Sequence, residues 1–180
     1  MKILLHTCCA PCAIHPVNVL RSRQWMVMGF FYRHNIHPYT ECMRREEAMG
    51  QYAESIGMKM IFQQDYNPEA FLRQAAFREA HRCRICYHDR LYAAAKTAKG
   101  GNFDAFTSTL LFSRHQNHEL IAETGEAVGK TVGVRFHYED FRDGWETGRE
   151  ASRSLGMYRQ QYCGCIYSEK DRYFRPAKTT

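Results

Sequence analysis

Seven of the eight cysteines in this 180-residue chain lie in three tight clusters that are far apart in the sequence. The clusters are Cys8-Cys9-Ala10-Pro11-Cys12, Cys83-Arg84-Ile85-Cys86 and Cys163-Gly164-Cys165. Cysteine thiolates grouped in this way are the usual ligands of structural zinc and of iron–sulfur clusters. The residue types and their spacing therefore predict a metal site built from several thiolates.

A disulfide framework is the main alternative, and the cellular compartment decides between the two. The stretch from Met1 to Leu5 is too short for the apolar core of a secretory signal. No apolar run approaches the roughly 20 residues that span a bilayer, so we expect a soluble, cytoplasmic chain without a membrane partner. In a reducing cytosol, clustered cysteines are more often metal ligands or redox-active thiols than structural bridges.

The number of thiols exceeds what one metal site needs. A structural zinc or an iron–sulfur cluster takes about four thiolates. The other three could hold a second metal with an open coordination position, or two of them could form a redox-cycling dithiol. Adjacent Cys8 and Cys9 cannot easily chelate one ion together, so we expect them to face two different centres. Cys42, on a predicted helix, is expected to be a small buried hydrophobe.

Two other interpretations stay open at this point. A zinc-stapled nucleic-acid-binding module would use the thiolates only to hold loops together. A thiol–disulfide oxidoreductase would use them without any metal. The pair Cys163-Gly164-Cys165 is too strained for an easy disulfide, and the C-C-x-x-C pattern is not typical of a zinc ribbon.

The composition is that of a globular protein with a basic surface. The formal charge is +6, the pI is about 8.9, and 13% of the residues are aromatic. Cationic side chains and exposed rings suit a nucleic-acid partner, through phosphate neutralisation and base stacking. At this length we expect a single catalytic domain over residues 1–175 and a flexible tail at 176–180.

Apolar runs alternate with amphipathic stretches, which is typical of an α/β fold with a parallel sheet. The expected strands are 2–6, 26–32, 59–63, 103–107 and 134–138. We therefore predict a three-layer, Rossmann-like domain. The Cys8 cluster follows the first strand directly, which places it at the carboxyl edge of the sheet, where such folds bind ligands. Residues 32–38 and 107–114 follow their own strands and should line the same edge.

Helical stretches lie between the strands. The expected helices with recognisable ends are 41–56, 67–80 and 87–98. Thr40 is predicted to cap the first of them, and Gly57 is predicted to terminate it. The third should begin directly after the C-x-x-C turn of Cys83 and Cys86, which turns two sulfurs toward one metal.

Several motifs, in the same order, resemble one known family. They are His6-Thr7-Cys8-Cys9-Ala10-Pro11-Cys12, Asn35-Ile36-His37-Pro38, Arg82-Cys83-Arg84-Ile85-Cys86-Tyr87 with Arg90-Leu91, Phe106 to Leu111 with Ser113 and Gln116, Asp140-Phe141-Arg142 with Gly144, and Tyr158-Arg159-Gln160-Gln161-Tyr162-Cys163-Gly164-Cys165. From Lys2 to about Ser168 the chain is similar to the cobalamin-independent epoxyqueuosine reductase family, QueH. One departure is Arg33-His34, where that family is associated with Asn-Pro. It concerns the rim loop and leaves the cysteines untouched.

The resemblance implies a tRNA-modifying oxidoreductase. Members of the family reduce the epoxide of epoxyqueuosine, at the wobble position of tRNAs that read Asp, Asn, His and Tyr codons, to the alkene of queuosine. It also implies a fold similar to the nucleotide α-hydrolase-like domains, a [4Fe-4S] cluster beside a further mononuclear iron, and an external electron donor. We expect neither cobalamin nor ATP, because cysteines replace the Gly-rich segment of ATP-binding relatives. The expected cluster ligands are Cys8, Cys9, Cys83, Cys86, Cys163 and Cys165, and Cys12 completes the metal-binding set.

Removal of an epoxide oxygen takes two electrons and two protons, so a nearby acid is required. Position beside a cysteine motif or a rim loop selects the candidates His6, His115, Asp140 and Tyr162. The candidates for contact with the tRNA backbone are Arg82, Arg84, Arg90, Arg149, Arg153 and Arg159. The rings that could stack on a splayed base are those of Tyr87, Tyr158 and Tyr162.

Overall fold

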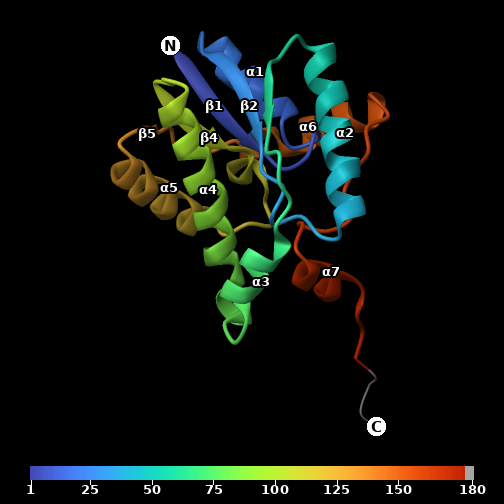
Figure 1. The fold of residues 1–180 in the computed structure, drawn as a ribbon. Helices are drawn as coiled ribbons and strands as arrows, with labels where there is room; N and C mark the ends of the chain where they lie inside the picture. Colours follow the sequence, from blue (N-terminus) through green and yellow to red (C-terminus); the bar gives the residue numbers. More distant parts are fainter. Residues whose placement is uncertain (177–180) are drawn as a thin grey trace.

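The computed structural model describes residues 1–176, which form a five-stranded parallel sheet with helices on both faces (Figure 1). The strands are β1 (Lys2–Thr7), β2 (Met26–Phe31), β3 (Met60–Phe62), β4 (Ala105–Ser108) and β5 (Arg135–Phe136). They pair in the order β3-β2-β1-β4-β5. The predicted parallel α/β class and its five strands are confirmed, although β5 is shorter than expected. From residue 177 onward, the predicted tail lies outside the described residues.

β1 occupies the centre of the sheet because it is apolar along almost its whole length. All of its residues except Lys2 are buried, which is typical of a parallel strand covered on both faces. Leu4 lies opposite Met28 of β2 on one side and opposite Phe106 of β4 on the other. The chain leaves β1 toward β2 and β3 and then returns to the opposite side at β4. The carboxyl end of β1 is therefore a topological switch point, where open α/β sheets bind ligands.

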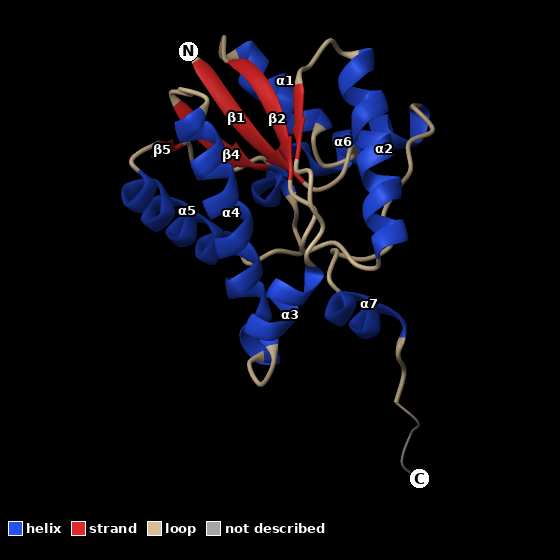
Figure 2. Ribbon diagram, in the orientation of Figure 1, coloured by secondary structure: helices blue, strands red, loops and turns tan. Residues whose placement is uncertain are grey.

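Helices cover both faces of this sheet, as Figure 2 shows. The helices are α1 (Ile14–Ser22), α2 (Tyr39–Ser55), α3 (Pro68–Ala75), α4 (Arg82–Gly100), α5 (His118–Val132), α6 (Trp145–Ser154) and α7 (Ile166–Tyr173), with 3-10 turns η1 (Glu79–His81), η2 (Thr109–Phe112) and η3 (Arg142–Gly144). α4 packs against α5 on one face, and α1 packs against α6 on the other. In the described part of the chain, no helix combines the length and the apolar character needed to cross a bilayer.

The first predicted helix begins earlier than expected. Thr40 lies inside α2, and the backbone of Pro38 takes the N-cap position without any side-chain cap. The Pro38 carbonyl accepts hydrogen bonds from the backbone N–H groups of Glu41 and Cys42, so the helix starts before the threonine. At the other end, Gly57 adopts a φ of 61°, which terminates the helix as predicted.

The region around the second cysteine cluster also differs from the prediction. Asn67 caps α3 through its side chain, as expected, by accepting from the Ala70 N–H at 3.1 Å. The helix ends at Ala75 instead of about residue 80, because Phe77 adopts a φ of 60° that an α-helix cannot contain. α4 then begins at Arg82, five residues earlier than predicted. The C-x-x-C pair is therefore helical, and its i, i+3 spacing puts both thiols on one side of the first turn.

Candidate metal centre

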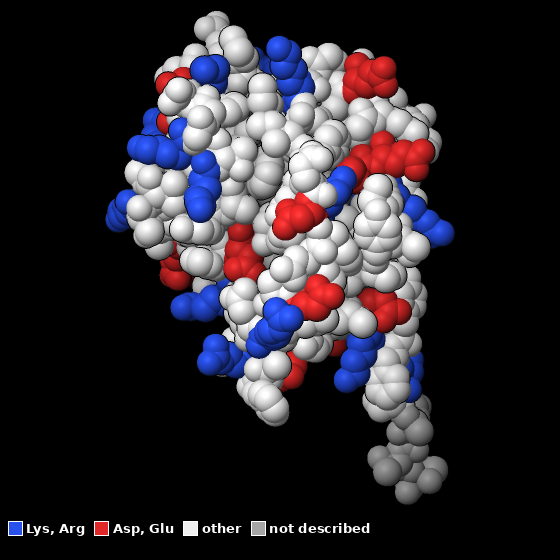
Figure 3. Space-filling view, viewed as in Figure 1, with Lys and Arg blue, Asp and Glu red and all other residues white. Residues whose placement is uncertain are grey.

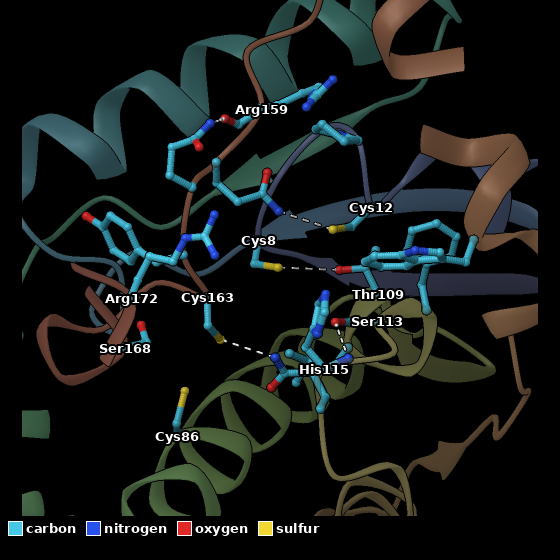
Figure 4. Close-up of a pocket in the computed structure, with 18 of the residues that line it drawn as sticks. Cys8, Cys12, Cys86, Thr109, Ser113, His115, Arg159, Cys163, Ser168 and Arg172 are labelled. Carbon is cyan, nitrogen blue, oxygen red and sulfur yellow. Dashed lines mark hydrogen bonds between the residues drawn. The ribbon is translucent and has the colours of Figure 1, made fainter. Parts of the chain in front are cut away.

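A cavity of about 520 Å³ lies at the carboxyl ends of β1 and β4, the edge at which the first cysteine cluster was expected. Four cysteines from three distant segments line it, and Figure 4 shows their side chains around the same space. Cys8 and Cys12 follow β1, Cys86 belongs to α4, and Cys163 precedes α7. The parallel sheet brings these segments together because its strand ends, and the loops after them, meet at one edge.

The other three clustered cysteines adjoin this cavity without lining it. Cys9 is buried beside Cys8, whereas Cys83 is exposed in the first turn of α4. Cys165 is buried in a small apolar cluster that also contains Cys86 and Phe71. The structure therefore brings the three sequence clusters into one region, with four thiols at the cavity itself.

All eight cysteines have free thiols, so the structure contains no disulfide within residues 1–176. Cys42 is fully buried and its thiol donates to the Arg33 carbonyl, as expected for a small core residue. In the same residues, no three or more His, Cys, Asp or Glu side chains are arranged to hold one ion.

Hydrogen bonds within the first cluster make its thiols unequal. The Cys12 and Cys9 thiols donate to Cys8, which holds the pKa of Cys8 well below its usual range, and Arg90 adds to the effect. Burial raises the pKa of Cys9. The Gln160 amide donates to the sulfurs of Cys9 at 2.9 Å and of Cys12 at 3.4 Å. Cys8 is therefore the most readily ionised thiol of the three.

Arg90 is a buried cation beside these thiols, and the residue is only 2% exposed. Its guanidinium donates to the Cys86 sulfur at 3.2 Å, the Asn35 carbonyl at 3.1 Å and the His6 Nε2 at 3.4 Å. Burial by itself lowers its pKa, but the Cys86 and Cys8 sulfurs raise the pKa above its usual value. Arg90 nevertheless lines the cavity, so the contact with tRNA that the sequence suggested for this residue stays a prediction.

His6 lies under the cavity and does not line it. Its Nδ1 is 2.8 Å from the Ser108 hydroxyl, and its Nε2 faces Arg90. Burial, with the nearby Arg90 charge, lowers the pKa of His6 to about 3. The imidazole is therefore neutral near pH 7 and accepts a hydrogen bond from the arginine, so it is poorly suited to deliver a proton.

The three other acid candidates occupy different places. His115 is exposed, lines the cavity and packs its ring edge-on against Trp145 at 5.4 Å. Tyr162 also lines the cavity, but its hydroxyl donates to the His37 carbonyl, and burial raises its pKa to about 12. Asp140 lies outside the cavity.

Asp140, in the segment between β5 and η3, is held by an ion pair with Arg142. Its carboxylate accepts two hydrogen bonds from the Arg142 guanidinium, at 2.8 and 2.6 Å. These bonds lower its pKa to about 2, so this carboxyl group is ionised and does not carry a transferable proton near pH 7.

The predicted tRNA-binding arginines also separate by location. Arg149 and Arg159 are exposed and line the cavity. Arg82 pairs with Asp171, which is itself a lining residue. Arg84 and Arg153 are exposed but lie outside the lining.

The hydroxyl groups of two candidate stacking tyrosines are hydrogen-bonded to other side chains. Tyr87 lines the cavity, but it is buried, and its hydroxyl donates to Gln116 at 2.9 Å. Tyr158 is half-buried, and its hydroxyl donates to Glu41. Gln116 in turn donates to the Cys163 sulfur at 3.3 Å, so Tyr87 orients a hydrogen-bond donor for a thiol.

A buried ion pair holds the third cysteine cluster in place. Arg45 of α2 donates to Glu41 at 2.7 Å and to the carbonyls of Tyr162 and Cys163 at 2.9 and 2.7 Å. Because Arg45 is only 1% exposed, these bonds fix the loop before α7 rigidly against α2. Sequence reasoning did not select this residue, because it stands in the charged run Arg44-Arg45-Glu46-Glu47, a pattern that is typical of a solvated helix face.

Other lining residues were given no role from the sequence. Gln116 and Gln160 belong to the motifs that carry the resemblance, and Arg172 was not singled out, yet all three reach the cavity. Polar residues next to cysteine motifs are common in loops, so only the assembled fold distinguishes those that point at a sulfur.

Comparison with known proteins decides the family. A family model described as "Epoxyqueuosine reductase QueH" matches residues 3–171. The chain belongs to the epoxyqueuosine reductase QueH family. A relative of that name from Dehalococcoides mccartyi is 37% identical over 97% of this chain and 96% of its own length. Another, from Thermotoga maritima, is 30% identical over 94% of this chain and 91% of its own. The expected family and oxidoreductase class are confirmed.

A solved structure supports the fold. The predicted subunit of a tRNA methyltransferase from Methanocaldococcus jannaschii superposes with a TM-score of 0.59, over 85% of this chain and 76% of the other. The two sequences are only 9% identical, so the likeness concerns the α/β architecture alone.

Proposed function

We propose that this protein reduces the epoxide of epoxyqueuosine to the alkene of queuosine at the wobble position of tRNA. Membership of the QueH family supports the reaction. The observation that carries it in this chain is the convergence of Cys8, Cys12, Cys86 and Cys163 on one cavity. Both carbon–oxygen bonds of the epoxide break, two electrons and two protons are taken up, and the oxygen leaves as water. The electrons come from an external donor.

The thiols fit the [4Fe-4S] cluster and additional iron that the family resemblance implies. A cluster takes four thiolates, and this region offers seven. Arg90 supports the fit, because a buried guanidinium needs anions around it, and within residues 1–176 its neighbours that can become anionic include the sulfurs of Cys86, Cys8 and Cys163. The ligands would be mainly Cys83, Cys86, Cys163 and Cys165 for the cluster, with Cys8, Cys9 and Cys12 shared between the two metals. When bound, the metals supply single electrons and polarise the epoxide oxygen as a Lewis acid.

His115 is the candidate proton donor that the geometry favours. It is the exposed, cavity-lining acid of the four, and Trp145 limits the movement of its ring. His6 is buried and neutral, Tyr162 is bound to a carbonyl, and Asp140 lies elsewhere. A proton leaving the His115 imidazole can reach an oxygen in the cavity directly.

The cationic rim of the cavity suits a tRNA anticodon. Arg149, Arg159 and Arg172 line it and can neutralise phosphates on either side of the modified nucleotide. The substrates on this proposal are the tRNAs that read Asp, Asn, His and Tyr codons. Trp145 offers an aromatic wall at the entrance for the inserted base.

The test is anaerobic purification, iron, zinc and sulfide analysis, and incubation with dithionite and tRNA carrying epoxyqueuosine. We expect about four irons with equal sulfide, one further iron, and loss of one oxygen from the nucleoside by mass analysis. His115→Gln should lower kcat about a hundredfold at unchanged metal content, whereas the exposed His88→Gln should not.

The opposite results identify the alternatives. Zinc without sulfide and an unchanged nucleoside would point to a stapled binding module. A metal-free protein whose thiol titre changes by two on mild oxidation would point to a thiol–disulfide oxidoreductase. Full activity in His115→Gln would leave the reaction standing but remove this residue from it.

A further inference from the structure

Phe77 is an apolar ring presented fully to solvent at the end of α3. Its side chain is 100% exposed, which is the largest exposure among the large hydrophobic residues of the described chain. The backbone holds it there in the left-handed region, with a φ of 60°, an unfavourable conformation for a bulky side chain. The Phe77 N–H donates to Glu79 at 3.1 Å, and the Arg78 N–H donates to the Ala75 carbonyl, which fix the turn.

Three arginines lie on the same stretch of α3, the turn and the start of α4 as this ring. Arg73, Arg78 and Arg84 are all exposed. Among residues 1–176, none of these three forms an ion pair with a carboxylate. Figure 3 shows Lys and Arg side chains, interspersed with Asp and Glu, on the part of this face that holds α3 and α7. We call Phe77 and these three arginines the α3 tip.

The α3 tip is continuous with the cavity. Arg82 follows the tip, stacks over Tyr167 at 5.8 Å and bonds to Asp171 of the cavity lining. Cys86, another lining residue, is one helical turn farther along α4. The five residue-to-residue steps from Phe77 to Arg82 span at most about 18 Å, which a few unpaired nucleotides can bridge.

We propose that the α3 tip binds the unpaired nucleotides of the anticodon loop that flank the nucleotide in the cavity. This rests on the proposed function, and it adds where the rest of the RNA lies. The Phe77 ring stacks on one splayed base, while the arginines neutralise the adjacent phosphates. A lone, fully exposed ring among unpaired cations has the composition of a single-strand RNA platform.

The primary test is the affinity for full-length tRNA, measured by fluorescence anisotropy at fixed salt, because it does not depend on turnover. Phe77→Ala should weaken binding about tenfold, and Phe77→Trp should restore it, since stacking needs only a flat ring. Replacing Arg78 by alanine should reduce the slope of log affinity against log salt by about one. The matched control is Met26→Ala, which removes an exposed apolar side chain at the first residue of β2. This variant should bind tRNA normally.

Activity assays separate this inference from the proposed function. With dithionite as reductant, Phe77→Ala should raise KM for tRNA and leave kcat unchanged. A wild-type protein that binds tRNA through Phe77 but never deoxygenates it would refute the proposed function and keep the inference. If the wild-type protein turned over and Phe77→Ala bound tRNA as tightly as the wild type, the inference would be refuted and the proposed function kept.

Two further outcomes would also overturn the inference. If Phe77→Ala slowed turnover with a protein electron donor but not with dithionite, the tip would be a donor-docking surface. If the wild-type sedimented as a dimer and Phe77→Ala as a monomer, it would be a self-association surface. Hydrogen exchange of the wild-type protein provides a check without mutation, because bound tRNA should protect residues 76–84.

Discussion

At the scale of single residues, the site depends on a buried cation that sequence reasoning assigned to the surface. Arg90 contacts a sulfur, a backbone carbonyl and an imidazole, and in the described part of the chain it forms no ion pair with a carboxylate. An isolated buried charge is expensive, and it is tolerated where anions neutralise it. Thiolates held by a metal are such anions. Arg90 therefore links the stability of the fold to the ionisation of Cys8 and Cys86.

We predict that Arg90→Leu yields a protein with little or no bound iron. Without the guanidinium, the Cys86 and Cys8 thiolates lose a compensating charge, and Asn35 loses a hydrogen-bond donor. Iron and sulfide analysis with the visible absorption spectrum measures the effect. Arg90→Lys should retain an intermediate amount, because it keeps the charge but not the three-way geometry.

The matched control lies on the same helix. Lys96→Leu removes an exposed cation of α4 and should leave the metal content unchanged. Full iron and sulfide in Arg90→Leu would show that the thiolates do not need this cation.

At the scale of elements, a half-buried histidine connects the rim loop after β2 to α3. His34 accepts the Asn67 N–H at 2.8 Å through Nδ1, at the residue that caps α3. Gln63, just beyond β3, lies 2.5 Å from its Nε2. Arg33 and His34 depart from the family pattern, and both hold the rim loop in place. Arg33 pairs with Glu46 of α2, while His34 bonds to the residue that caps α3.

We predict that the protein loses stability as the pH falls below about 6.5, in part through His34. Burial lowers the pKa of His34 from 6.5, and Asp65 only partly opposes this. The unfolded chain therefore takes up the proton first, so stability is complete above the unfolded value and declines below it. Thermal unfolding at pH 7.5 and 5.5 measures the decline.

The contribution of His34 can be isolated by substitution. His34→Gln should unfold at a lower temperature at pH 7.5 and show a smaller further drop at pH 5.5. The exposed His88→Gln should retain the wild-type dependence. A stability that rises on acidification would contradict the assignment.

At the scale of the whole molecule, the thiols bridge two apolar clusters. The main core surrounds the sheet and includes Cys8, Cys9 and Cys12. A smaller cluster, with Phe71, Ala75, Cys86 and Cys165, joins α3, α4 and the start of α7. Ligands on both sides mean that a bound metal would hold the small cluster against the large one.

We predict that removing the metal loosens the small cluster selectively. β4 and all of β1 except Lys2 are buried, and the two strands pair without any cysteine, so their amides should stay protected from hydrogen exchange. Amides of residues 158–173 should exchange much faster in the metal-free protein than in the purified one. Equal protection of this segment in both forms would show that Arg45 and the apolar contacts suffice to hold it.

Much of the architecture could be predicted because it depends on local patterns. Apolar strands of period two, turn residues and cysteine spacings are properties of short segments, and they led to the parallel sheet, its order of elements and the thiol-rich edge. Helix ends were less accurate: the backbone of Pro38 started α2, and the strained turn at Phe77 divided what resembled one helix.

From the sequence alone we could place the first cysteine cluster at the carboxyl edge of an α/β sheet and recognise a resemblance to the QueH family. The neighbours of each thiol became clear only from the folded structure. Arg90 is buried and carries a charge opposite to that of a thiolate, and Asp140 forms a separate ion pair. The Gln160 amide donates to two sulfurs that lie about 150 residues away in the sequence. Such partners meet only after the strands pair and the helices pack, because burial and contact are properties of the assembled chain and leave no periodic trace in its sequence.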